Sequence, residues 1–352
     1  MTSSQRFPPM DGQGLERALP PSPEPPVTLP RRRALALLAG TLCCPSLVHA
    51  NTFPSRPVRI IVPFVPGGSS DVIARLLAPR LTTLLGQQVI VDNRPGAAGN
   101  LAVELTARAN PDGHTMLLGA PGALTVNPLL YKDLKFIPLR DLAAVSMVGQ
   151  LEHAIVVSRN FPATDLNGFI QHARANPGRV TYGSSGVGTT THLAGAMFAQ
   201  QAGIKLQHIS YRGAGQAMVD LMSGTINAMF DLLPSSISHV RSGSVRVLAT
   251  TGPTRAAQLP DVPTAIESGL KGFVATSWHA LMAPKETPPN LLAVLSTAVG
   301  RALAEPELVE RMASLGAVPI PTNPAATTAF LRADAARWAG VIKAAQITLE
   351  NQ

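Results

Sequence analysis

The chain has 352 residues, of which 45% are hydrophobic and 14% are charged, together with 29 glycines and 32 prolines. This length allows two α/β domains with cores of their own, and this composition excludes a largely disordered protein. The formal net charge of +8 includes one arginine run, at residues 31–33, and no basic stripe interleaved with aromatic residues. Nucleic-acid binding is therefore not expected.

The first fifty residues differ from the rest. Residues 1–30 are rich in proline and lack apolar periodicity, which predicts a disordered segment or one that precedes the true start of translation. Arg31 to Arg33, the apolar run 34–42 and the small-residue end at 48–50 are together typical of an export signal at residues 31–50. An apolar core of roughly ten residues is too short for a membrane anchor, which needs ~20. Cleavage after about Ala50 and a periplasmic location are expected, while Sec and twin-arginine export both stay open.

Removal of this signal would also remove both cysteines, Cys43 and Cys44. The mature protein is therefore expected to have no disulfide and no cysteine-ligated metal. Its net charge would be about +6, which favours anionic solutes only weakly.

From Val58 onward, short β-branched segments alternate with amphipathic ones, a pattern typical of βαβ units. A glycine-rich loop at 67–71 separates the first strand from a helix whose apolar residues recur at helical spacing until Gly86. Strands are predicted at 58–64, 89–92, 115–119, 143–158, 180–182, 206–211, 228–231, 245–250 and 273–282. Helices are predicted at 73–84, from about Asn100 to 110, and at 166–175, 192–202, 214–222, 289–304 and 325–343.

The order of these elements predicts two domains. Residues 151–272 form a second set of strand and helix units, and the tail contains no third set. We therefore expect one lobe from residues 51–150 and 273–352 and another from residues 151–272. The chain would cross between the lobes twice, which makes a hinge.

Templates for catalysis and metal binding do not fit the sequence. Gly183 to Val187 lacks the closing glycine of a nucleophile elbow, and Gly186 to Thr191 begins like a dinucleotide fingerprint but ends in threonine. None of the seven histidines beyond residue 50 has metal-ligand spacing. No catalytic residue, metal or cofactor is therefore predicted, and the protein is not expected to be an enzyme.

Two loops that precede helices are candidates for ligand binding. A helix N-terminus offers free N–H groups and a dipole that favour an anion, and ligands bind beyond the carboxyl ends of parallel strands. In the loop 66–71, Gly67 and Gly68 allow close backbone approach and Ser69 and Ser70 add hydroxyl groups, although Ser70 or Asp71 could simply cap the helix. The loop 184–192 holds more hydroxyl groups than capping requires.

Two charged residues have open roles. Asp231 ends a buried apolar strand and either receives a ligand hydroxyl or amine or caps the next helix. Arg212 either clamps a carboxylate or is a solvated loop cation.

Several short segments, in order over the mature chain, resemble the Bug-type receptors of tripartite tricarboxylate transporters. They are residues 57–64 (PVRIIVPF), 66–71 (PGGSSD), 93–100 (NRPGAAGN), 111–113 (PDG), 182–186 (YGSSG) with 188–189 (GT) and 192–193 (HL), 211–213 (YRG), 259–264 (LPDVPT) and 283–284 (AP). The resemblance implies a type II periplasmic-binding-protein fold, in which two α/β lobes with mainly parallel sheets close around a carboxylate. Backbone amides, hydroxyl groups and water hold the ligand in that fold.

The resemblance also implies a ligand-binding set. It comprises Gly67, Gly68, Ser69, Asp71, Ser184, Ser185, Thr189, Thr190 and His192, and further Phe64, Gly122, Arg212 and Asp231. Arg212 stands where lysine is common, and Val65 where alanine or proline is common, which leaves room for a ligand other than the usual dicarboxylates.

The expected function is uptake of a small carboxylate by a monomer that serves membrane permease subunits. Two alternatives are a receptor that presents its ligand to a membrane sensor kinase and an exported hydrolase that uses Ser184 or Ser185.

Overall fold

The computed structural model describes Ser22 and residues 53–344. The predicted disordered segment at 1–30, apart from Ser22, and the predicted export signal at 31–50 lie outside the described residues. Within the described ranges, no helix is both long enough and apolar enough to cross a membrane.

The first part of the fold consists of parallel strands joined by helices, as the sequence pattern predicts. Strand β1 lies between β2 and β3 and pairs in parallel with both. Helix α2 ends where Gly86 adopts a left-handed backbone, with φ 68°, and donates its N–H to the carbonyl of Thr82. The elements are β1 (Val58–Val62), α2 (Ser69–Leu85), β2 (Val89–Asn93), the 3-10 turn η2 (Ala97–Gly99), α3 (Asn100–Ala107) and β3 (Thr115–Gly119).

One long strand, β4 (Leu142–Ser158), takes part in two groups of strands. Its residues 142–152 pair antiparallel with β9 (Thr276–Pro284), and its residues 153–157 pair antiparallel with β7 (Ala228–Leu232). The short helical elements η3 (Gly122–Val126), α4 (Asn127–Leu130) and α5 (Pro138–Asp141) lead into it. A single strand, β4, therefore belongs to both groups and connects them.

The second group of strands repeats the parallel arrangement. Strand β5 lies between β6 and β7 and is parallel to both, while β8 pairs antiparallel with β4. The elements are α6 (Leu166–Ala175), β5 (Thr181–Ser184), α7 (Thr190–Ala202), β6 (Gln207–Ser210), α8 (Ala214–Ser223), β7, α9 (Leu233–Arg241) and β8 (Val245–Thr250). The order over both groups is β2-β1-β3-β9-β4-β7-β5-β6 within the described residues.

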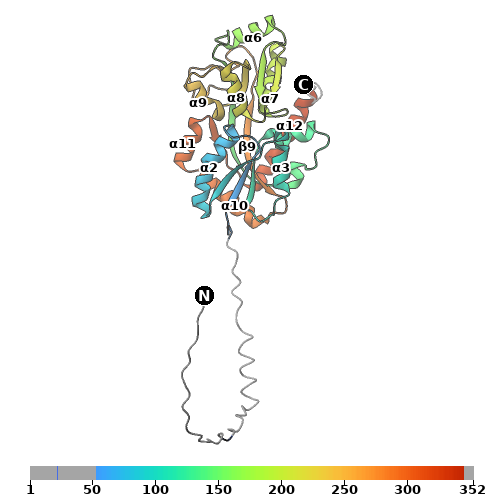
Figure 1. Ribbon diagram of the computed structural model, residues 1–352, viewed down its shortest axis with the longest axis vertical. Coiled ribbons are helices and arrows are strands. Elements are labelled where there is room, and N and C mark those ends of the chain that lie inside the picture. Colours follow the sequence, from blue (N-terminus) through green and yellow to red (C-terminus); the bar gives the residue numbers. More distant parts are fainter. Residues whose placement is uncertain (1–21, 23–52, 345–352) are drawn as a thin grey trace, which may run out of the picture. The chain divides into compact units, whose positions relative to one another are not determined.

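The last part of the chain returns to the first group of strands. Strand β9 pairs antiparallel with β3, and β10 pairs antiparallel with β4. Figure 1 shows α6, α7 and α8 at one end of the fold and α2, α3 and α10 at the other. The elements after β9 are α10 (Pro289–Leu303), α11 (Pro306–Ser314), β10 (Ala317–Pro319) and α12 (Pro324–Ala344).

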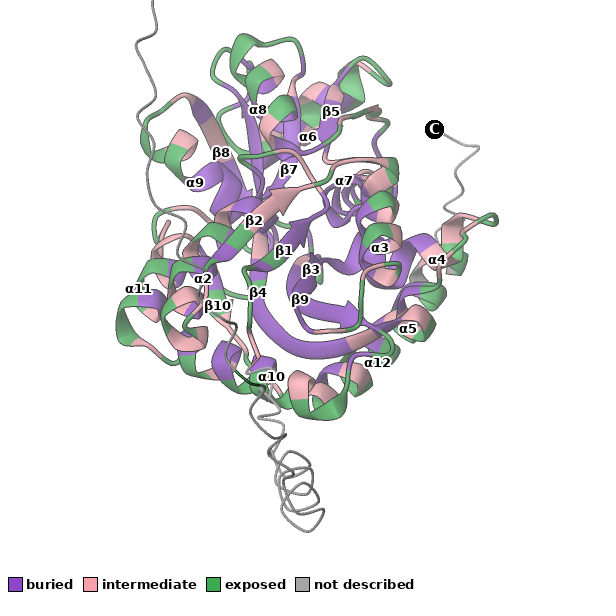
Figure 2. Ribbon diagram, turned by 60° about the horizontal axis from the view of Figure 1, so that its bottom comes forward, coloured by how far each residue is buried: buried purple, intermediate pink, exposed green. Residues whose placement is uncertain are grey.

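Helices cover both faces of each group of strands. In β1, Ile60 and Val62 pack into a core with α2, α10 and α11, while Ile61 packs on the opposite face with α3 and Leu331 of α12. Helices α6 and α7 cover one face of the second group, and α8 and α9 cover the other. Figure 2 shows the strands largely buried and the helices exposed on their outer sides. This two-sided burial explains why the central strands β1, β3 and β7 are mostly apolar, whereas the edge strand β6 is polar and partly exposed.

The structure confirms the predicted two-lobed α/β fold class, with differences in detail. The parallel strands predicted for each lobe are present, and the antiparallel strands β4, β8, β9 and β10 make the sheet mixed. Helix α2 begins at Ser69, earlier than predicted, because Gly68 already adopts the extended N-cap conformation. Helices α9 and α11 were not predicted. Each has a proline in its first turn, where the missing N–H costs no helical hydrogen bond.

Candidate functional site

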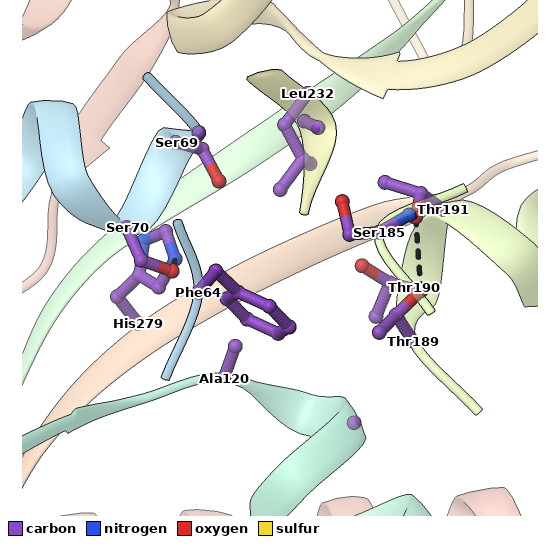
Figure 3. Close-up of a pocket in the computed structure, with 13 residues that line it drawn as sticks. Phe64, Ser69, Ser70, Ala120, Ser185, Thr189, Thr190, Thr191, Leu232 and His279 are labelled. Carbon is purple, nitrogen blue, oxygen red and sulfur yellow. Dashed lines mark hydrogen bonds between the residues drawn. The ribbon is translucent and has the colours of Figure 1, made fainter. Parts of the chain in front are cut away.

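A cavity lies where several helices begin, and Figure 3 shows the side chains around it. It encloses about 400 Å³ of space not filled by protein atoms, including the part open to solvent. Its lining comprises Phe64, Gly68, Ser69, Ser70, Ala120, Gly122, Ser185, Thr189, Thr190, Thr191, Ala214, Leu232 and His279.

One wall of the cavity is the start of α2. Gly68 is the N-cap residue and contributes no side-chain cap, so the first N–H groups of this 17-residue helix lack helical partners. The hydroxyl of Ser69 points toward the cavity (Figure 3) and makes no hydrogen bond within the described part of the chain. This wall therefore presents unpaired donors.

The facing wall is the start of α7. Here Thr189 is the N-cap residue, and its Oγ1 accepts from the backbone N–H of His192 at 3.4 Å and donates to the carbonyl of Gly186 at 2.7 Å. The Oγ1 of Thr191 accepts the backbone N–H of Ser185 at 3.0 Å, so these two hydroxyls hold the loop in shape. The hydroxyl of Ser185 makes no hydrogen bond among the described residues and faces the cavity across from Ser69 (Figure 3).

Two further elements begin at the cavity. Ala214 is the first residue of α8, and Gly122 is the first residue of the π-helical turn η3. A Cβ on Gly122 would lie 3.1 Å from the Cα of Thr189, so glycine allows η3 to approach the start of α7 closely. Phe64, Ala120 and Leu232 supply the apolar part of the lining.

The cavity is favourable to an anion although no Lys, Arg, Asp or Glu of the described chain lines it. Helices α2, α7 and α8 direct the positive ends of their dipoles and their unpaired N–H groups toward it. His279 is the one lining residue that can titrate near neutrality, and its burial lowers its pKa to about 4. The imidazole is therefore neutral at pH 7, and electrostatic attraction must come from backbone dipoles.

Seven residues of the predicted ligand-binding set line this cavity. They are Phe64, Gly68, Ser69, Gly122, Ser185, Thr189 and Thr190. Phe64 and Ser185 also line a second hollow on the outer side, together with residues 95–99, Tyr131 and Arg212. Arg212 is exposed and lies in that outer hollow rather than in the cavity.

Two other predicted residues support the α2 wall. Asp71 does not line the cavity; its carboxylate accepts from the backbone N–H of Gly67 at 3.1 Å, from Arg75 Nε at 3.0 Å and from Asn93 Nδ2 at 3.0 Å. Burial would raise the pKa of Asp71, but the hydrogen bonds from Arg75, Gly67 and Asn93 outweigh it and lower the pKa below the ordinary value. Gly67 is exposed and also lies outside the cavity.

Ser184 and His192 support the α7 wall from behind. The Oγ of Ser184 lies 2.7 Å from Nε2 of His208 and accepts the N–H of Gly186 at 3.1 Å. The Nδ1 of His192 accepts the N–H of Gly188 at 3.2 Å, and its ring centroid lies 4.2 Å from that of His208. Burial, with a smaller contribution from His208, lowers the pKa of His192 to about 3. Both side chains are buried and neither lines the cavity.

Asp231 is buried next to the cavity-lining Leu232 but is not part of the lining. Its Oδ2 accepts from the hydroxyl of Ser235 at 2.6 Å, and its Oδ1 has no partner among the described atoms. Burial raises its pKa to about 6 despite the hydrogen bonds from Ser235 and the backbone. Its carboxylate therefore contacts Ser235 near the start of α9.

The set implied by the resemblance lacks six lining residues, of which the first two lie in the two candidate loops: Ser70, Thr191, Ala120, Ala214, Leu232 and His279. Ala214 follows Gly213 at the start of a predicted helix, so the same helix-terminus argument could have found it. His279 lies inside a strand, and no local sequence signal marks it. Among the described residues, no group of three or more His, Cys, Asp or Glu is placed to hold a metal ion.

Comparison with known proteins places the chain in a family. Residues 73–347 match the family model for the tripartite tricarboxylate transporter family receptor. The protein BugT of Bordetella pertussis is 39% identical over 297 residues, which cover 84% of this chain and 91% of BugT. This chain belongs to the Bug-type receptors of tripartite tricarboxylate transporters.

Solved structures agree with this assignment. The R. palustris protein Rpa4515, solved with adipate, is 32% identical with a TM-score of 0.82 over 84% of this chain and 99% of that one. MatC from Rhodopseudomonas palustris, solved with bound malate, is 30% identical with a TM-score of 0.78 over 82% of this chain and 100% of that one. The family consists of periplasmic solute-binding receptors, and this Bug-type receptor shares their two-lobed fold.

Proposed function

We propose that this Bug-type receptor is exported, binds a small carboxylate in the cavity between α2 and α7, and delivers it to the membrane permease of a tripartite tricarboxylate transporter. The observation that carries the proposal is a cavity onto which three helix N-termini converge and which no charged side chain of the described chain lines. Such a site favours an acid over a cation or a neutral molecule.

The division into two lobes implies that they move together when the ligand binds. We place lobe 1 at residues 51–150 and 273–352 and lobe 2 at residues 151–272, with β4 and the segment before β9 as the two connections. The α2 wall and η3 then belong to lobe 1, and the α7 wall and the start of α8 belong to lobe 2. Ligand binding would shift an open and closed equilibrium toward the closed form, because only that form offers donors from both walls.

The proposed ligand contacts divide into two groups. Backbone or hydroxyl hydrogen bonds would come from Gly68, Ser69, Gly122, Ser185 and Thr190, and Phe64 would pack against the carbon chain. Thr189 would contact the ligand without donating to it, because its N–H and its hydroxyl both donate to the carbonyl of Gly186. The two loops would be held in shape by Gly67, Asp71, Ser184 and His192. Asp231 would lie behind the cavity. Arg212 would contact only a ligand long enough to reach the outer hollow. Support for a dicarboxylate comes from Rpa4515 with adipate and MatC with malate.

The remaining parts of the proposal concern location and partners. The signal at 31–50, cleaved after about Ala50, would deliver a monomer to the periplasm. Partnership with a sensor kinase in place of a permease is the main alternative, and transport assays on a strain that lacks the receptor would separate the two.

A hydrolase is the second alternative. The Ser184 hydroxyl does lie 2.7 Å from a histidine nitrogen, but the serine is fully buried and outside the cavity lining. We therefore propose a non-enzymatic receptor. An ester-hydrolysis assay on the purified protein tests this point directly.

A thermal-shift screen tests the binding function. The mature protein would be purified through unfolding to remove carried-over ligand and screened against mono-, di- and tricarboxylates, amino acids and aromatic acids. At 100-fold excess over its Kd, a true ligand adds about 2.7 kcal/mol of stability. A melting temperature that no carboxylate raises would show that the ligand class is wrong.

A further inference from the structure

A hydroxyl and an imidazole form a pair in the cavity wall. The Oγ of Ser70, in the first turn of α2, lies 2.8 Å from Nε2 of His279 in β9. Ser70 is 2% exposed and His279 is 0% exposed, yet both line the cavity, and Figure 3 shows them on the side opposite the α7 wall. The pair connects positions 209 residues apart in the chain.

This pair has hydrogen-bonding capacity that the protein leaves unused. A neutral imidazole has one donor and one acceptor nitrogen, and a hydroxyl has one donor and two acceptor sites. Nε2 of His279 is engaged with Ser70, whereas Nδ1 has no partner among the described atoms. Buried polar atoms without partners are unfavourable. A ligand in the cavity that forms a hydrogen bond with the Ser70–His279 pair is therefore favoured over one that presents hydrocarbon to it.

The pair is not needed to hold a carboxylate charge. Helix starts already provide that attraction, and burial keeps the imidazole neutral by lowering its pKa to about 4. A neutral group that both donates and accepts suits an uncharged polar substituent, such as a hydroxyl or a carbonyl oxygen.

Resting on the proposed carboxylate function, we propose that Ser70 and His279 are specificity-determining residues that select a carboxylate bearing an additional hydroxyl or oxo group over its unsubstituted analogue. The ligand class is then a hydroxy or oxo acid, and a plain aliphatic acid of the same length binds more weakly.

Matched ligand pairs test the selection. Isothermal titration would compare malate with succinate and 2-oxoglutarate with glutarate on the wild-type protein. We expect the substituted member of at least one pair to bind about tenfold more tightly, the discrimination that one hydrogen bond supplies. His279→Leu and, separately, Ser70→Ala should reduce this ratio to within about twofold, mainly by weakening the substituted member. His279→Asn keeps a polar atom near the Nδ1 position and should retain part of the preference.

The chain offers a matched control in His153. This histidine is also buried, its Nε2 also lacks a partner among the described atoms, and burial lowers its pKa to about 4 as well, but it does not line the cavity. His153→Leu should therefore leave the ligand ratio unchanged even if it lowers the melting temperature.

The outcomes separate the two levels of the proposal. Equal binding of both members of each pair by the wild type overturns the selection and leaves carboxylate binding intact. A ratio that survives both His279→Leu and Ser70→Ala also overturns it and assigns the pair a purely structural role between α2 and β9. If no carboxylate of either kind binds, the proposed function fails and this inference fails with it.

Discussion

The substitution Gly215→Ala should weaken ligand binding without weakening the fold. Gly215 is the second residue of α8, in the proposed lobe 2, and lies against the loop before α2 in the proposed lobe 1. An ideal Cβ at this position would lie 2.7 Å from the carbonyl oxygen of Pro66. Since ordinary contact begins at 3.4 Å, the loop and the helix must move apart by several tenths of an ångström. We take the form with this contact to be the closed one, so the added methyl group acts against closure.

The expected size of the effect follows from the cost of overpacking. Relieving such a contact costs about 1–3 kcal/mol, which corresponds to an affinity lower by about 5- to 150-fold. In the open form the contact is absent, and replacing a helical glycine by alanine adds up to about 1 kcal/mol to stability. Stability and affinity are therefore expected to change in opposite directions.

Isothermal titration would measure the affinity, and thermal unfolding without ligand would measure the stability. Gly300→Ala is the matched control, because Gly300 is also helical and half-buried, but a Cβ there would meet no atom within 4 Å. The control should gain stability and keep its affinity. If Gly215→Ala binds as tightly as Gly300→Ala, the closing contact between α8 and the Pro66 loop is not part of the bound state.

Three further substitutions test the assignment of site residues. Ser185→Leu places a large side chain at a residue that lines both the cavity and the outer hollow. Titration should then detect no binding while circular dichroism shows an intact fold, and retained binding would remove this loop from the site. Arg212→Ala should change the affinity for a short dicarboxylate by less than about fivefold, because the side chain is exposed and lies in the outer hollow, and a larger loss in titration would make it a carboxylate clamp. Asp231→Asn should stabilise the protein at neutral pH. Burial raises the pKa of Asp231 in the folded protein to about 6, from 3.8. The stability that comes from protonated Asp231 is therefore fully present below about pH 4 and is lost as the pH rises through 6. Denaturant unfolding at pH 4 and 7.5 should show the mutant gaining roughly 2 kcal/mol relative to wild type between these values, and a gain independent of pH would contradict the shift.

The sequence predicts the walls of the site because they depend on local rules. A glycine or threonine before an amphipathic segment marks a helix start, and parallel strands bring several helix starts to one edge of a sheet. This reasoning is sufficient to reach Gly68, Ser69, Ser185, Thr189 and Thr190, all of which line the cavity.

The rest of the site depends on contacts between distant segments. Asp71 lies in a predicted ligand loop, but its carboxylate already accepts a hydrogen bond from Asn93, 22 residues further along the chain. His279 becomes a lining residue because β9 runs beside β3 in the first group of strands, and strand register at that distance cannot be read from local pattern. The sequence of β4 likewise shows one uninterrupted strand. Only its pairing with β9 and β7 reveals that its two ends belong to different groups of strands.

The proposed anion site is built from main-chain groups, and this has an evolutionary consequence. Every residue type except proline carries the same peptide N–H, so a point mutation in these helix starts rarely abolishes the basic attraction for acids. Side chains around the cavity can then vary and change the preferred solute, while affinity for acids as a class is retained. A gene duplicate of such a receptor can acquire a new nutrient specificity through few substitutions, without passing through a form that binds nothing.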